Sequence, residues 1–385
     1  MTVRILVDVV VVASVVTALA ITPRVLARRP GPSGAAGRRV LTPAVGLAVV
    51  TGLVHVNQVL FTVYVLRVHD GDPSFVARFL PAGWFDLASA SPVLRGLAGH
   101  FPAPDLLAPS VLRVQAFLEL PFVLLAFATV VRWLDAGLYR RIACSALLPS
   151  AAVSYTAVFC LVEWDLRNPY TVDDLVIRAV SAVVTPLLLA RAAARDPGAS
   201  RVPASMPGLL VFIGSLGSLA VLVLVVYDTA LLYSLGRLDD RLPLAVAAAV
   251  ALTALRAVAA RLPDASAPTL SFVVHALRHW LLLFFVPALA IRYGLLFGTP
   301  RLALAAGALT AAAACARAAR EAAAGALLRL TARVGCAVLA GAACAAVALR
   351  LTPPSYAEVA LLSAMGAFLV TGVAVCGLLD RVRGG

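Results

Sequence analysis

Long apolar stretches separated by short polar ones dominate the chain. A helix that spans a membrane needs about 20 mostly apolar residues, and by that rule the pattern predicts about eleven spanning helices. The weakest is the alanine-rich stretch 302–326, which we expect to be either a poor span buried by its neighbours or an interfacial helix. The predicted fold class is therefore all-α, a polytopic membrane helix bundle that forms a single domain over 1–385. The predicted spans cover approximately 3–23, 42–66, 111–134, 143–162, 174–192, 208–233, 242–260, 271–294, 302–318, 326–349 and 357–379.

Charge alternates along the segments that connect the predicted spans. Segments after odd-numbered spans are basic, as in Arg24 to Arg39, whereas segments after even-numbered spans are mixed or acidic. Arginine-rich connections stay in the cytoplasm, so we expect the N-terminus outside and the C-terminus inside, in the plasma (inner) membrane. The arginines that follow the first apolar run also favour a retained helix over a cleaved signal peptide.

Composition changes this picture in one respect, the choice of partner. The chain is 62% hydrophobic, against about 45–50% for a soluble domain, and its net charge of +13 is concentrated at span ends. This distribution indicates a lipid bilayer as partner and no nucleic acid. Every basic residue is arginine, which excludes enzymes that form a Schiff base on lysine.

The six cysteines lie in apolar stretches without a C-x-x-C pair. We interpret them as small buried side chains and expect no metal and no cofactor.

The longest predicted loop, 67–110, joins the second and third spans outside the membrane. It carries amphipathic stretches, with Trp84 as an interfacial anchor. Two interpretations stay open: a lid that gathers substrate, and short interfacial helices that only bridge two distant spans.

Polar residues inside the second and third spans form the first candidate site. His55 and Gln58 share one helical face, Gln115 and Glu119 share another, and all lie at similar depth in the outer half. Ionisable groups inside membrane helices are costly, so they indicate function by default. We assign His55, Glu119 and Gln58 as candidate catalytic groups for general acid/base chemistry.

Further charges in the same half predict substrate binding. The candidates share an expected outer-half position, and their arginines suit an anionic phosphate or carboxylate. The alternative is a purely structural network in which these residues pair with one another and with Asp8. The candidates are Arg113, Gln115, Arg178, Asp228 and Arg292.

A second cluster, His275, Arg278 and His279, lies in the inner half of the eighth span. The sequence H-A-L-R-H lacks the glutamate of the zinc-protease motif H-E-x-x-H. We interpret the cluster as a cationic patch near the cytoplasm that binds a lipid headgroup or phosphate. Helix–helix hydrogen bonding is the alternative.

Two acids, Asp173 and Asp174, stand at the start of the fifth span. Carboxylates there suit the helix dipole, and we interpret both as caps. A metal-binding pair is the alternative.

Three functions follow from these patterns. The first is a membrane enzyme or enzyme subunit, of transferase, cyclase or dehydratase type, acting on an amphipathic small molecule or peptide. The second is a transporter that uses the same charges for coupling, although no internal repeat is present. The third is a non-catalytic scaffold subunit.

Two resemblances bear on this choice. In helix number and in the acids of its outer loop (Asp70, Asp72, Asp86 and Asp105) the chain resembles polyprenol-dependent glycosyltransferases. Those usually place the loop after the first span, where this chain is basic. In length and composition it is similar to membrane components of bacterial natural-product pathways, such as the linaridin dehydratase subunits. That likeness implies natural-product biosynthesis and a second membrane subunit.

Overall fold

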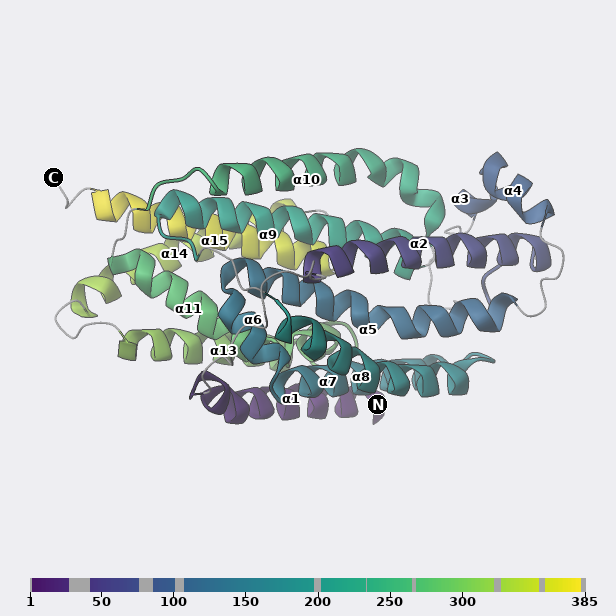
Figure 1. The fold of residues 1–385 in the computed structure, drawn as a ribbon, viewed down its shortest axis with the longest axis horizontal. Helices are drawn as coiled ribbons and strands as arrows, with labels where there is room; N and C mark the ends of the chain where they lie inside the picture. Colours follow the sequence, from purple (N-terminus) through teal and green to yellow (C-terminus); the bar gives the residue numbers. More distant parts are fainter. Residues whose placement is uncertain are drawn as a thin grey trace.

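The computed structural model describes residues 2–27, 42–75, 86–100, 107–196, 202–232, 234–264, 268–321, 327–352 and 357–381. Its long helices run close to one common axis (Figure 1). Ten of them in the described chain are long and apolar enough to cross a membrane, and one bent pair raises the count to as many as eleven. The predicted all-α membrane bundle is therefore confirmed. The ten are α1 (Thr2–Ala27), α2 (Pro43–Val68), α5 (Leu107–Leu134), α7 (Leu147–Leu166), α8 (Thr171–Ala194), α9 (Met206–Val226), α10 (Leu238–Ala259), α13 (Pro300–Glu321), α14 (Leu327–Leu351) and α15 (Ala357–Arg381).

The outer surface of the bundle is apolar. Leu339 and Leu351 on α14 are 74% and 77% exposed, and α10 buries only Ala248 of its described side chains. Apolar side chains on the outside suit a lipid environment. The helical backbone suits it as well, because each helix satisfies its own backbone hydrogen bonds. The alanine-rich stretch also forms a full helix, α13, which meets the length and composition of a span.

The eighth predicted span is broken into α11 (Pro268–Phe284) and α12 (Ala288–Leu296). The two parts meet at 69°, and Pro287 directly precedes α12. Proline lacks the N–H of a helix interior and its ring clashes with the carbonyl four residues earlier. The span predicted as one continuous helix is thus two.

The sixth span changes pitch at its end. After α9 the chain forms a π-helical turn, η1 (Tyr227–Leu231), then the short turn η2 (Leu235–Arg237). Single π-helical turns inside helices are rare and occur frequently at functional sites. Here the turn brings Asp228, Thr229 and Ala230 into the interior.

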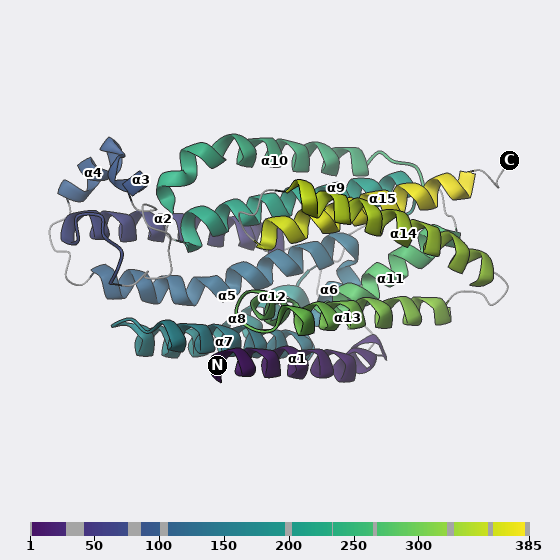
Figure 2. The same cartoon turned by 180° about the vertical axis from the view of Figure 1, so that it is seen from behind.

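Part of the long loop forms α3 (Asp86–Ser89) and α4 (Pro92–Gly99), which lie beside the end of α2 in both views (Figures 1 and 2). Arg67 at the end of α2 donates to the carbonyl oxygens of Ala98 at 2.9 Å and Gly99 at 3.1 Å. Trp84, the expected anchor, lies outside the described residues. The remaining short helix, α6 (Ala136–Ala143), follows α5 directly and lies away from α3 and α4 (Figure 1).

Candidate functional site

A cavity of about 1320 Å³ runs through the middle of the bundle. Apolar side chains from α5, α7, α9 and α11 to α15 make most of its wall. Among the described residues, five charged side chains line it: Glu119, Glu163, Asp174, Arg178 and Arg292. An apolar pocket with a few convergent polar groups is the usual form of a small-molecule site.

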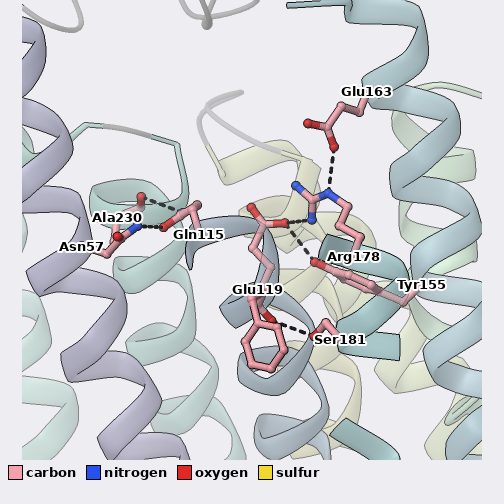
Figure 3. A network of polar contacts seen from close by, with 9 residues as sticks. Asn57, Gln115, Glu119, Tyr155, Glu163, Arg178, Ser181 and Ala230 are labelled. Atoms are coloured by element: carbon pink, nitrogen blue, oxygen red, sulfur yellow. Dashed lines mark hydrogen bonds and ion pairs between the residues drawn. The ribbon is translucent and has the colours of Figure 1, made fainter. Parts of the chain in front are cut away.

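Arg178 of α8 is the centre of the polar wall. Its Nε donates to Oε2 of Glu163 at 2.7 Å, and its Nη1 donates to Oε2 of Glu119 (Figure 3). The hydroxyl of Tyr155 donates to the same Glu119 oxygen at 3.2 Å. The guanidinium carbon lies 4.5 Å from the centroid of the Phe159 ring. All these side chains are buried or nearly so, and one cation therefore serves two carboxylates.

A proline explains how α5 and α8 are held together beside this cluster. Pro121 has no N–H, so the carbonyl of Phe117, four residues earlier, lacks its helical donor. Ser181 of α8 donates to that carbonyl at 2.8 Å instead (Figure 3). The bond ties the two helices together two residues from Glu119 and three residues from Arg178.

Asp174 adds a third carboxyl group to the wall. It is 4% exposed and interacts with Glu163. Its Oδ1 has no hydrogen-bond partner among the residues that the structure describes. It lies in the first turn of α8, as expected, but the helix has Tyr170 at its N-cap and no side-chain cap bond. The expected capping role is thus replaced by a position on the cavity wall.

Amide side chains form a second network, which joins α2, α5 and the π-turn. Asn57 donates to the carbonyl of Val111 at 2.9 Å and to Oε1 of Gln115 at 3.2 Å. Gln115 in turn donates to the carbonyl of Ala230 in the π-turn at 3.3 Å (Figure 3). Gln115 also lines the cavity.

His55 and Gln58 lie apart from Glu119. His55 donates from Nδ1 to the carbonyl of Thr51 at 3.1 Å, and its Nε2 is 3.2 Å from the hydroxyl of Thr229. Gln58 donates to the hydroxyl of Thr62, one turn later in α2, at 3.3 Å. The described cavity wall includes neither His55 nor Gln58. The structure thus divides the expected single pocket into a histidine–amide part and a carboxylate part.

The other outer-half candidates have partners of their own. Arg113 pairs with Asp173 at the surface, and Asp228 accepts from Arg241 at 2.9 Å. Arg292 lines the cavity with its guanidinium carbon 4.3 Å from the ring centroid of Tyr227.

Asp8 has a different kind of partner from the arginine expected of a charge network. It accepts from the backbone N–H of Thr299 at 2.9 Å and from that residue's hydroxyl.

The second cluster lies at the opposite end of the bundle and meets acidic partners. Arg278 pairs with Asp135, and His279 Nε2 is 2.9 Å from Oε1 of Glu321. His275 Nε2 lies 3.7 Å from Oε2 of the same glutamate. The described cavity wall does not include these residues. Each basic residue of the expected patch has an acidic neighbour within the protein.

Sequence reasoning missed Tyr155 and Glu163, and it assigned Asp174 to a helix cap. A signal for them was present: Tyr155, Phe159 and Glu163 recur every four residues along α7, and Asp174 and Arg178 do so along α8. That spacing places side chains on one helical face. In the described chain, no group of three or more histidine, cysteine, aspartate or glutamate side chains is arranged to hold a metal ion.

Comparisons with protein-family models, with curated proteins and with solved structures found no match to this chain.

Proposed function

We propose that the protein is a membrane enzyme, or the membrane subunit of one, that acts on an amphipathic substrate held in the cavity. One observation carries the proposal: the ionisable cluster of Glu119, Glu163, Asp174 and Arg178 lines a mostly apolar cavity. Such a pocket binds an apolar chain and directs a polar head to a few placed groups. Carboxyl groups in a site with little water serve as general acids and bases.

The roles follow from the hydrogen bonds. Tyr155 and Arg178 fix Glu119 in place, so its carboxylate is oriented and stabilised. Asp174 presents an oxygen without a protein partner in the described chain, which suits it to exchange a proton with a substrate head. His55, away from the wall, acts as a positioning residue for the π-turn through Thr229.

Substrate enters sideways from the bilayer in this proposal. Leu304 of α13, Val338 of α14 and Met365 of α15 line the cavity and are also exposed on the outer surface. In Figure 2 these three helices lie on the same face of the molecule. An apolar molecule dissolved in lipid reaches this opening without crossing water.

The plasma membrane, with the N-terminus outside, remains our proposal for location, from the alternation of arginine-rich connections. A bacterial natural-product pathway and a second membrane subunit belong to the same proposal, by compositional likeness.

One observation favours transport as a second candidate. The break between α11 and α12 reaches the cavity, since Phe284 and Ala288 on either side of it line the wall. Discontinuous helices at a central site are typical of secondary transporters. Proton-driven uptake of the bound molecule into proteoliposomes would favour this candidate over the enzyme.

The test is to identify what the cavity holds. The protein is purified in a maltoside detergent, and bound molecules are extracted and identified by mass spectrometry. Gly307→Phe fills the cavity, because a side chain at Gly307 meets open space. Ala305→Phe on the exposed side of the same helix is the control.

We expect an amphipathic molecule in the native protein and in Ala305→Phe, and its loss in Gly307→Phe. Incubation of that molecule with native protein and Glu119→Gln then tests for conversion. No bound molecule in any sample, or equal amounts in all three, contradicts the proposal.

A further inference from the structure

The charges on the cavity wall do not balance. Three carboxyl groups and two arginines line it in the described chain. Arg178 already donates to Glu119 and Glu163, and Arg292 lies against the ring of Tyr227. The wall thus has one more acid than bases, and Asp174 is the acid whose Oδ1 lacks a hydrogen-bond partner in the described chain.

A buried carboxylate needs a compensating charge or donor. Burial of an unpaired ion is strongly unfavourable, and two adjacent carboxyl groups cannot both ionise at low cost. Asp174 and Glu163 are such neighbours. Either a proton or a cation from outside the protein must therefore compensate the pair.

The same geometry disfavours an anionic ligand. A phosphate or carboxylate head near Asp174 would meet the charges of Glu119 and Glu163 as well. Arg178 offers little to such a head, because its Nε and Nη1 are already used. The expectation from sequence that arginines hold an anion therefore loses its support at Arg178.

We propose that the cavity binds an amphipathic amine, with its ammonium head at Asp174 and its apolar chain between α13 and α15. This inference rests on the proposed function and names its substrate class. An ammonium group supplies both the missing positive charge and the N–H donors that Oδ1 lacks. The small residues Gly307, Ala308 and Ala311 of α13, facing Met365 and Phe368 of α15 across the cavity, leave room for a chain.

Protons balance in this binding step without any covalent change. An ammonium ion from solvent displaces the proton shared by the carboxyl pair, which leaves to solvent. A neutral amine instead takes that proton and forms the same ion pair in place.

Four probes with one chain length test the head group. Dodecylamine, dodecanol, dodecyltrimethylammonium and dodecanoate are titrated into the purified full-length protein in maltoside detergent, and binding is measured by native mass spectrometry and thermal shift. We expect dodecylamine to bind about tenfold or more tightly than each of the others. Dodecanol lacks the charge, dodecyltrimethylammonium lacks the donor, and dodecanoate has the wrong sign.

Two neighbouring variants make the test specific. Asp174→Asn should abolish the preference for dodecylamine, whereas Asp173→Asn, one residue earlier but at the surface, should retain it. Thermal shift without probe shows whether each variant is folded.

Each other result is decisive. Preferred binding of dodecanoate, dodecanol or dodecyltrimethylammonium overturns the amine but leaves an amphipathic substrate in place. An unchanged amine preference in folded Asp174→Asn also overturns the amine, since the ammonium head then does not depend on the Asp174 carboxylate. If Gly307→Phe binds every probe as tightly as the native protein does, the probes do not occupy the cavity. That result contradicts the proposed function itself.

Discussion

The two ends of the bundle hold their buried charges in different ways. Toward the end of the bundle that carries the C-terminus, three arginines each pair with one acid, and these pairs are absent from the described cavity wall. Toward the other end, Arg178 serves both Glu119 and Glu163, and Asp174 stands beside them on the cavity wall. The C-terminal pairs are Arg132 with Asp196, Arg278 with Asp135, and Arg333 with Asp380.

The difference separates stabilising pairs from a site. A one-to-one pair satisfies both members, so it fixes helices and leaves nothing for a ligand. A cation shared among acids leaves charge and hydrogen-bonding capacity unsatisfied, which a substrate or proton must supply. Stoichiometry within a buried cluster is therefore a better guide to function than the presence of charge.

The largest effect should follow from removing the shared cation. Arg178→Leu leaves Glu119 and Glu163 buried without their partner, and breaking a buried pair costs about 3–5 kcal/mol. We expect a marked fall in the melting temperature of the detergent-purified protein, or failure to fold. Arg178→Lys is the control: it retains the charge but not the two-sided donor geometry, and should lose less stability. Equal stability of Arg178→Leu and native protein would contradict the shared-cation arrangement.

Removing an arginine that pairs with a single acid should cost less stability than removing Arg178. Arg132 donates to Asp196 from Nε at 2.5 Å and from Nη2 at 3.0 Å. The Arg132 side chain is 16% exposed, so Arg132→Leu should cost less than Arg178→Leu, about 2–3 kcal/mol. Binding of dodecylamine to the folded fraction should be unchanged. Altered binding would mean that the C-terminal pairs also shape the site.

The sequence was sufficient for the fold but not for its details. Hydropathy located the spans because length and apolarity are what a bilayer requires. The break at Pro287 was not predictable, since Pro121 and Pro186 lie inside unbroken α5 and α8. Whether a proline breaks a helix depends on the partners its neighbours find, such as Ser181 for the carbonyl of Phe117.

The candidate site was predictable from the sequence only in part. Glu119 and Arg178 stood out as isolated charges within apolar spans, and the structure joins them. His55 and Glu119 were expected together because their depths agree, yet depth does not determine which helix each face meets. Asp174 was read as a helix cap because position in the first turn does not reveal which way a side chain points.

Two buried serine hydroxyl groups should show a smaller difference in the free energy of unfolding. Ser181 and Ser215 are both fully buried, and each donates to a carbonyl at 2.8 Å. Ser181 supplies the carbonyl that Pro121 leaves without a helical donor, whereas the carbonyl that Ser215 contacts, four residues earlier in α9, retains its backbone partner. Ser181→Ala should therefore destabilise by about 1–2 kcal/mol and Ser215→Ala by clearly less. Denaturation in mixed detergent compares the two, and equal losses would remove the special role of Pro121.

The smallest effect belongs to the surface pair beside the site. Arg113 and Asp173 form an ion pair, but their side chains are 47% and 46% exposed, so water screens it. Exposed pairs contribute about 0.2–1 kcal/mol, and Asp173→Asn should change the melting temperature by little and leave amine binding intact. Asp174→Asn, one position further, should remove the preference for dodecylamine while the protein stays folded, because that carboxyl faces the cavity. If Asp173→Asn weakens binding as much as Asp174→Asn, the effect is one of total charge at the start of α8. This pair of variants therefore tests whether amine binding depends on the burial of Asp174 or only on a negative charge at the start of α8.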